Sequence, residues 1–228
     1  MPTTRSNRCS SPSKRSSAVP DLTIVVTGTD TEVGKTWLTV ELALALQQRG
    51  ARVVIRKPVQ SFDPGDRTTD ADILAEASGE DPIVVCPGHR RYPLAMAPPM
   101  ASDALGGPSF KLEELIAEMD LPSTGVALVE GIGGACSPLS HDGDSVDLAH
   151  SLGADLVALV APAGLGTINS TRLASAALDG LRTVVFLNRF NPADTLHAAN
   201  RSWLTDVDGL DVETSPQELL ARLNLEVR

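Results

Sequence analysis

The chain has 228 residues, which is enough for one α/β domain with a sizeable core and too few for two ordinary enzymatic domains. Hydrophobic residues make up 42% of the chain and aromatic residues 3%, so Val, Leu, Ile and Ala must fill the core, as they do in helix-covered parallel sheets. The formal charge is −10, and because the first twenty residues hold four basic residues and no acid, residues 21–228 carry −14. A body this acidic repels phosphate backbones, which argues against nucleic acid as a partner.

The first twenty residues differ in composition from the rest of the chain. They are rich in Ser, Pro and Arg and too poor in apolar groups to offset the entropy of ordering, so residues 1–20 are predicted to be a disordered basic tail. An organellar transit peptide is the alternative for this segment. Residues 21–228 are then the folded domain.

Membrane insertion and export are not expected. No apolar run approaches the roughly 20 residues that span a bilayer, and no signal-peptide apolar stretch follows the basic residues. Cys9, Cys86 and Cys136 lack the spacing of a disulfide frame or a zinc site. These features fit a protein of the reducing cytoplasm.

After the tail, apolar runs alternate with segments that have helical spacing. The runs predict buried strands at 22–27, 53–57, 83–86, 126–130, 156–161 and 183–188. The periodic segments predict helices at 35–49, 69–78, 109–119, 167–178, 193–204 and 216–223. This order predicts a single-domain α/β fold with a mainly parallel sheet and helices on both faces, with ligands at the carboxyl ends of the strands.

The first strand leads directly into the sequence GTDTEVGKT, Gly28 to Thr36, and then into a helix. Unpaired backbone N–H groups and the helix dipole converge at such a junction and bind anions. Lys35 would place its charge on the terminal phosphates of ATP, and the Thr36 hydroxyl would reach a bound Mg²⁺. Thr29 stands where the usual phosphate-loop pattern has its first glycine, so the loop is a variant form.

A magnesium nucleotide also needs carboxylates, and two stand at suitable places. Glu130 closes the apolar run VALVE at a strand end, where its side chain would point into the ligand crevice. Asp70 opens a helix, where an acid can equally serve as a cap, and Asp72 is an alternative metal contact. Gly131 and Gly133 leave backbone without side chains beside the phosphates, or form a tight turn.

Four motifs in order resemble the dethiobiotin synthetase family, whose members have a phosphate-loop fold. They are GTDTEVGKT, then KPVQS at 57–61, VEGIGG ending at Gly134, and LGTIN at 165–169. The segment RYPLAMAP at 91–98 adds to the likeness. The resemblance implies a homodimeric enzyme that uses ATP and Mg²⁺ to carboxylate and cyclise 7,8-diaminononanoate with CO₂, through a carbamate and its phosphorylated form, to dethiobiotin.

The resemblance also implies roles for individual residues. Lys35, Lys57 and Thr31 fall on catalytic positions, where positive charge brings the anionic carbamate and triphosphate together. The metal positions are Thr36, Asp70 and Glu130, and the substrate positions are Lys57, Ser61, Asn169 and Asn200, with Asn169 supplied by the second subunit. The expected ATP contacts are Gly28, Thr29, Asp30, Thr31, Glu32, Val33, Gly34, Lys35, Thr36, Glu130, Gly131, Gly133 and Asn188.

Two departures from the family pattern concern the substrate pocket. Phe62 replaces a small residue that commonly follows the family's serine or threonine, and 98–102 reads PPMAS where a Pro-His pair is often found.

Three other functions would also use a phosphate loop of this kind. A partition-type ATPase switch needs a lysine five residues before Lys35, where this chain has Asp30. The ATP-using part of an amidotransferase would need a glutaminase domain, for which the chain has no length. A paralogue that uses the same fold on another substrate stays open.

Overall fold

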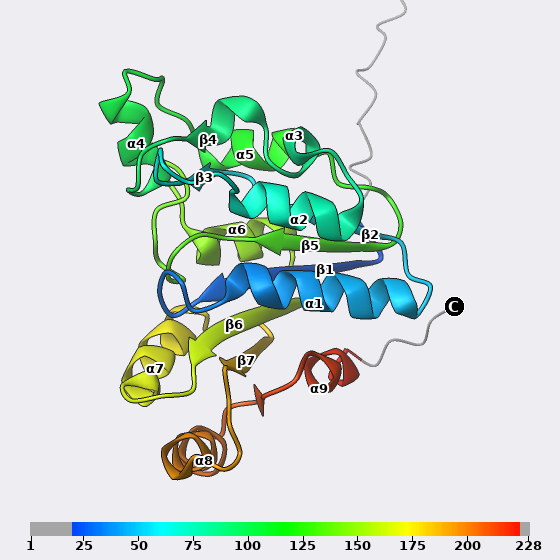
Figure 1. Cartoon of the computed structure of the whole chain (residues 1–228), viewed down its shortest axis with the longest axis vertical. Coiled ribbons are helices and arrows are strands. Elements are labelled where there is room, and N and C mark those ends of the chain that lie inside the picture. The colour runs from blue at the N-terminus through cyan, green and yellow to red at the C-terminus, as the bar shows by residue number, and fades with distance from the viewer. Residues whose placement is uncertain (1–19, 224–228) are drawn as a thin grey trace, which may run out of the picture.

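The computed structural model describes residues 20–223, and its central strand is β1, Leu22–Gly28. All seven of its residues are buried, because β1 has a parallel neighbour on each side and helices over both faces. The six parallel strands follow the order β2-β5-β1-β6-β7-β8 (Figure 1). The others are β2 (Val53–Arg56), β5 (Val126–Glu130), β6 (Leu156–Pro162), β7 (Thr183–Asn188) and β8 (Val212–Glu213).

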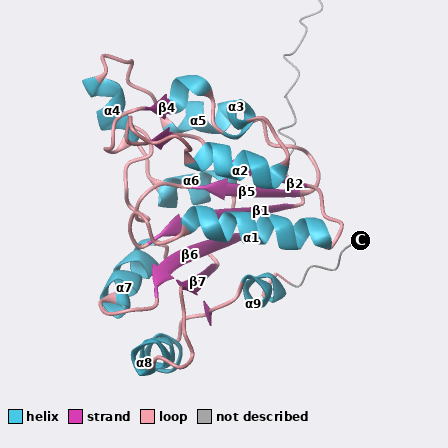
Figure 2. Cartoon of the chain, viewed as in Figure 1, coloured by secondary structure: helices cyan, strands magenta, loops and turns pink. Residues whose placement is uncertain are grey.

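Helices cover both faces of this sheet, and each face has its own apolar cluster (Figure 2). One face packs against α1 (Lys35–Gln48), α2 (Asp70–Ser78), α3 (Pro82–Val85) and α9 (Pro216–Ala221). The other packs against α4 (Pro98–Ala104), α5 (Leu112–Glu118), α6 (Ser145–Leu152) and α7 (Thr167–Ala177). The helix α8 (Thr195–Ser202) continues into a π-helical turn, Trp203–Val207, whose Leu204 joins the second cluster. The predicted fold class is therefore confirmed.

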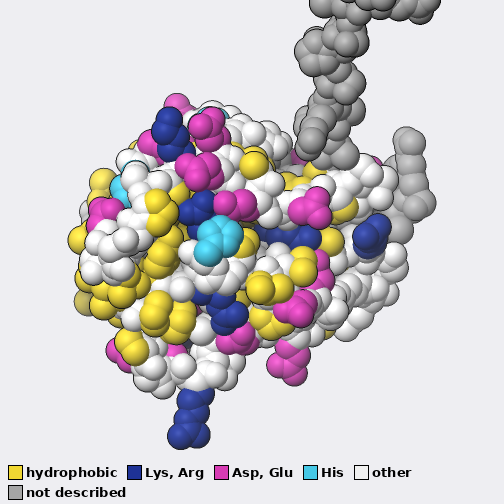
Figure 3. Space-filling model, turned by 90° about the horizontal axis from the view of Figure 1, so that it is seen from above, with side chains coloured by type: hydrophobic (Ala, Val, Ile, Leu, Met, Phe, Trp, Pro, Cys, Tyr) yellow, Lys and Arg dark blue, Asp and Glu magenta, His cyan; other side chains and the backbone are white. Residues whose placement is uncertain are grey.

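A second, two-stranded parallel sheet joins β3 (Gln60–Ser61) to β4 (Arg91–Tyr92), just after a 3₁₀ turn, Gly88–Arg90. It lies beside α2 and α4 in Figure 1. Seen from above, the acidic and basic side chains are interspersed and apolar side chains gather toward the α4 side (Figure 3). Met100 and Leu105 of this region are more than half exposed.

The strand predicted at 83–86 is wrong, because Pro82–Val85 is the short helix α3. Asp81 caps it by accepting a hydrogen bond from the Ile83 N–H, and Pro82 occupies the first helical position, where its missing donor costs nothing. Ile83 and Val84 are 60% and 47% exposed, so this apolar run is not a core strand.

Other elements differ at their ends or were not predicted. The helix expected at 109–119 begins at Leu112, because Lys111 is in extended backbone and its N–H donates to the Glu114 carboxylate at 2.9 Å. The helix expected at 193–204 begins at Thr195 because Asp194 caps it. Two helices that carry a capping acid or N-terminal prolines, α6 and α4, were not predicted, nor were the two-residue strands.

The prediction for residues 1–20 falls outside the described residues, apart from Pro20, which is buried. Within residues 20–223, no helix is both long and apolar enough to cross a membrane.

Candidate active site

The loop between β1 and α1 lies at the carboxyl ends of the central strands, at the mouth of a cavity of about 880 Å³. Gly34 ends this loop in the left-handed conformation, with φ of 101°, which a residue with a Cβ adopts only with strain. The missing side chain also leaves room for the Asn188 amide, whose Nδ2 donates to the Val33 carbonyl at 2.8 Å. The glycine of GKT thus links the loop to the end of β7.

Lys35 begins α1 and folds back over the loop. Its Nζ donates to the carbonyl oxygens of Asp30 at 2.9 Å and Gly133 at 2.8 Å, joining the loops that follow β1 and β5. Burial and the nearby Lys57 lower the pKa of Lys35 to about 8, although surrounding carboxylates act in the opposite direction. A buried ammonium held by neutral carbonyls is a suitable partner for an anionic ligand.

The centre of the site is a buried ion cluster formed by Lys57, Glu130 and Asp70. Lys57 Nζ lies 2.6 Å from Glu130 Oε1 and 2.7 Å from Asp70 Oδ2. Lys57 and Glu130 are 2% and 0% exposed, whereas the Asp70 side chain is 47% exposed and faces the cavity. Burial alone would lower the pKa of Lys57, but its two carboxylate partners outweigh burial and raise it.

Threonine hydroxyls complete the hydrogen bonding of Glu130. Thr36 Oγ1 donates to Oε1 at 2.9 Å and Thr39 Oγ1 donates to Oε2 at 2.8 Å. The Lys57 ammonium lowers the pKa of the Asp70 carboxyl against the opposing effect of burial. Three hard oxygen donors therefore converge, from Thr36, Glu130 and Asp70.

This donor set fits Mg²⁺, which prefers oxygen ligands and is commonly held by one or two carboxylates plus substrate phosphates. Within residues 20–223 there is no group of three or more His, Cys, Asp or Glu side chains that could hold a metal alone. Asp72, the alternative ligand, is engaged elsewhere: its Oδ2 accepts from the Thr69 N–H and hydroxyl, both at 2.8 Å.

The structure brings together most of the residues that the sequence analysis selected. Nine of them line the cavity: Thr31, Glu32, Gly34, Lys35, Thr36, Lys57, Ser61, Asp70 and Gly133. The remaining loop residues support it through the backbone, as Asp30 and Val33 do through their carbonyls. Added carbons at Gly28 and Gly131 would meet Val33 and Ser145, so both glycines permit close packing beneath the site.

Two predicted substrate residues lie apart from the cavity lining. Asn169 is exposed in the first turn of α7, which Gly166 caps with φ of 92°. Asn200 is buried, and its Nδ2 donates to the carbonyls of Ala163 and Gly164, both at 2.9 Å, so it fixes the turn before α7. Their roles toward a substrate stay predictions.

Several cavity residues were not selected from the sequence. Phe62, noted as a departure from the family pattern, faces the cavity, whereas Pro99 lies in the buried start of α4. Thr39 does not line the cavity but supports Glu130, and it could have been selected because it is a polar residue four positions after Lys35 on the buried face of α1. Other lining residues not selected are Gln60, Asp66, Thr68, Thr69, Met96, Ile132, Ser137 and Arg189.

Comparison with known proteins places the whole domain in one family. A family model described as an AAA domain matches residues 22–223. An ATP-dependent dethiobiotin synthetase of Mycobacterium avium is 42% identical over 68% of each chain, and one of Aquifex aeolicus is 32% identical over 90% of this chain and 93% of its own. A putative plasmid partition protein of Borrelia burgdorferi, solved with AMPPNP, covers 92% of both chains with a TM-score of 0.52 and 11% identity, which shows a shared fold alone. From the phosphate loop to the last helix, this chain belongs to the dethiobiotin synthetase family.

Proposed function

We propose that this chain is an ATP-dependent ligase of biotin biosynthesis that converts 7,8-diaminononanoate and CO₂ to dethiobiotin. The observation that carries the proposal is the placement of Lys35 and Lys57 beside three oxygen donors at one end of the cavity, in a chain of this family. A synthetase that joins two anions needs this combination of fixed positive charge and a place for a metal.

The reaction adds CO₂ to one substrate amine, which loses a proton and becomes a carbamate. A carbamate oxygen then takes the γ-phosphoryl group of ATP and releases ADP. The second amine attacks the carbonyl carbon, loses a proton and expels phosphate, which closes the ring, so that the reaction as a whole forms two C–N bonds. Mg²⁺, when bound, neutralises phosphate charge during the transfer.

The residues of this chain supply placement and charge. Lys35, at the start of α1, would bind the terminal phosphates, and Lys57, just after β2, would face the carbamate. Thr31 lines the cavity on the loop side and would donate to the reacting oxygens. Thr36, Asp70 and Glu130 would hold the metal, and Ser61 would contact the substrate.

We also propose a homodimer in which Asn169 of one subunit completes the cavity of the other. Support comes from the exposed start of α7, where Leu165 and Leu173 are 90% and 67% exposed beside Asn169. Sedimentation analysis of the full chain tests this: a monomer that forms product at normal rates would contradict it.

The experiment that tests the function is isotope incorporation. Purified protein, Mg-ATP, labelled bicarbonate and 7,8-diaminononanoate should give acid-stable labelled dethiobiotin, with one ADP per product. A Lys57→Met variant should give none. If the native chain hydrolyses ATP without forming labelled product, the proposed reaction is wrong and the protein catalyses a different phosphate-loop reaction.

A further inference from the structure

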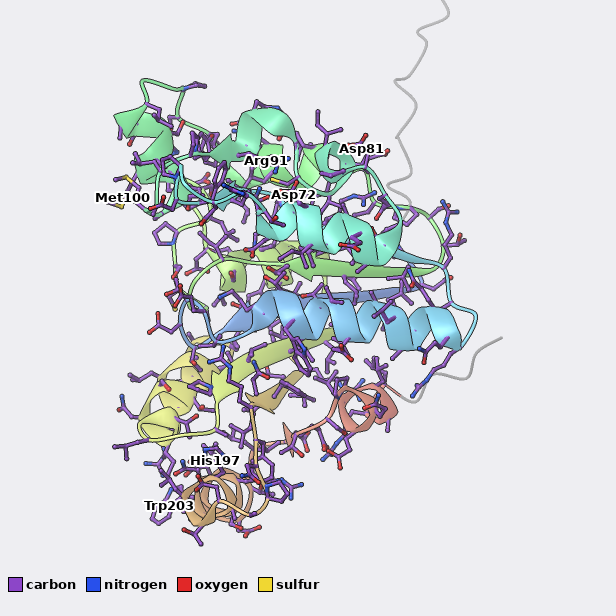
Figure 4. All side chains as sticks on the ribbon, in the orientation of Figure 1. Asp72, Asp81, Arg91, Met100, His197 and Trp203 are labelled. Atoms are coloured by element: carbon purple, nitrogen blue, oxygen red, sulfur yellow. The ribbon has the colours of Figure 1, made fainter. Side chains whose placement is uncertain are left out.

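The first turn of α2 is held by a group of four side chains, which we call the α2 clamp: Gln60, Thr69, Asp72 and Arg91. Arg91 lies on β4 and Gln60 faces it on β3, since the two are register partners in the small parallel sheet. Arg91 Nη2 donates to Thr69 Oγ1 at 2.8 Å and to Asp72 Oδ1 at 2.9 Å. Figure 4 shows Arg91 and Asp72 next to each other at the start of α2.

The hydrogen bonds of the α2 clamp use every donor and acceptor position of the Thr69 hydroxyl. It donates to Asp72 Oδ2 at 2.8 Å and accepts from Arg91 Nη2 and from Gln60 Nε2, the latter at 3.0 Å. A hydroxyl has one donor and two acceptor positions, so this group is saturated. Gln60 Oε1 also accepts from the Ala71 N–H at 3.0 Å, which ties the residues on both sides of Asp70 to β3.

Asp70 is the residue between these anchors, and it has no part in the clamp itself. It is the first residue of α2, flanked by Thr69 and Ala71, and its carboxylate faces Lys57 and the cavity. Fixing the backbone on both sides of a ligand residue fixes where its carboxylate can go. Outer partners of this kind usually affect metal affinity or activity by about 10–100-fold.

We propose that Arg91 is a positioning residue that keeps Asp70, and not Asp72, directed at the metal of the active site. The inference rests on the proposed magnesium site and names no new ligand. Arg91 contributes charge as well as hydrogen bonds, because its guanidinium forms an ion pair with Asp72 at 2.9 Å.

The test measures how strongly Mg²⁺ and nucleotide assist each other's binding. The affinity of the full chain for AMPPNP is determined by calorimetry in Mg²⁺ and again in EDTA, and the ratio of the two dissociation constants is the coupling. For Arg91→Met we expect the coupling to fall about tenfold, at the lower end of the outer-partner range, with affinity in EDTA unchanged. Arg91→Lys should recover most of it, because a single nitrogen, Nη2, makes both contacts.

Controls separate positioning from general stability. Arg222→Met removes a comparable arginine from Glu213 and Asp211, near the end of the chain and away from the cavity lining, and should leave the coupling unchanged. Asp72→Asn should reduce the coupling as Arg91→Met does. It replaces Arg91→Met as the test variant if the arginine variant does not fold. An unchanged coupling in folded Arg91→Met or Asp72→Asn, with only a lower melting temperature, would overturn the proposal.

The outcome does not depend on the proposed reaction. If the native chain shows the coupling but makes no dethiobiotin, the function proposal fails while the role of Arg91 is still measured. If the native chain binds AMPPNP equally well in Mg²⁺ and EDTA, the metal-positioning role is refuted even where dethiobiotin is formed.

Discussion

Replacing Lys57 with methionine should separate the structural role of this residue from its catalytic role. Methionine keeps the length and the apolar stem but removes the ammonium that lies 2.6 Å from Glu130 and 2.7 Å from Asp70. Glu130 is then a fully buried carboxylate supported only by two threonine hydroxyls among the contacts described above. Turnover should fall at least about 10²-fold, as when one preorganised donor is removed from a developing charge.

The stability cost follows from the burial of the pair. Removing one partner of a buried ion pair costs about 3–5 kcal/mol, and the two hydroxyl hydrogen bonds that Glu130 retains place this variant near 3 kcal/mol. For a chain of this size, that free energy corresponds to a fall in melting temperature of roughly 6–12 °C. The double variant Lys57→Met, Glu130→Gln should recover at least about half of the loss, because the amide buries no charge.

Melting temperature by calorimetry and turnover, measured on the same four proteins, test whether Lys57 and Glu130 stabilise each other as a buried pair. Native protein, each single variant and the double variant form a double-mutant cycle for the pair. Recovery of melting temperature without recovery of turnover is the expected result. A Lys57→Met protein that melts within about 1 °C of the native chain, or a double variant less stable than both single variants, would refute the reasoning about the buried pair.

Three further predictions concern other parts of the structure. Lys35→Ala should lose at least about 10²-fold in turnover and bind ATP more weakly, as measured by steady-state kinetics and calorimetry; near-normal turnover would contradict its role. Asn188→Ala should destabilise the chain by about 1–3 kcal/mol in urea unfolding, because the Val33 carbonyl loses its donor, and an unchanged midpoint would show that water replaces the amide. Burial raises the pKa of Cys86 to about 12, so iodoacetamide at pH 8 should modify Cys86 only after unfolding and the exposed Cys136 before it, as peptide mass spectrometry would show; early modification of Cys86 would indicate local opening.

The elements predicted best from the sequence are those whose conformation depends on residues that are close together in the chain. The junction from β1 to α1 combines a buried strand, a loop and a helix start within fifteen residues, and each of these has its own signal. The strand predicted at 83–86 is wrong because its local signal is ambiguous. Four apolar residues fit a buried strand or one helical turn equally well, and the decision came from Asp81 and Pro82 just before them.

Within the site, sequence reasoning identified residues but not their contacts. Lys57 and Glu130 both end strands, so parallel topology predicts that they meet at one edge of the sheet. That they form a buried pair depends on β2 and β5 being neighbours, with Val53 opposite Val126, and strand order cannot be obtained from the residue pattern. Arg91 was missed because its partners, Thr69 and Asp72, come close only through the two-residue strands.

The charges of the cluster explain why one lysine would not suffice for the proposed reaction. Lys35 and Lys57 are balanced by Asp70 and Glu130, so the described centre is close to neutral before any ligand binds. ATP and a carbamate together bring more negative charge than Mg²⁺ alone cancels. If Asp70 and Glu130 held the metal, the Lys57 ammonium would lose these two partners and would be available to the carbamate. The contacts that stabilise the ligand-free fold would thus also keep a positive charge beside the substrate. Lys57→Met should therefore lower both the melting temperature and the turnover, whereas adding Glu130→Gln should recover melting temperature and not turnover.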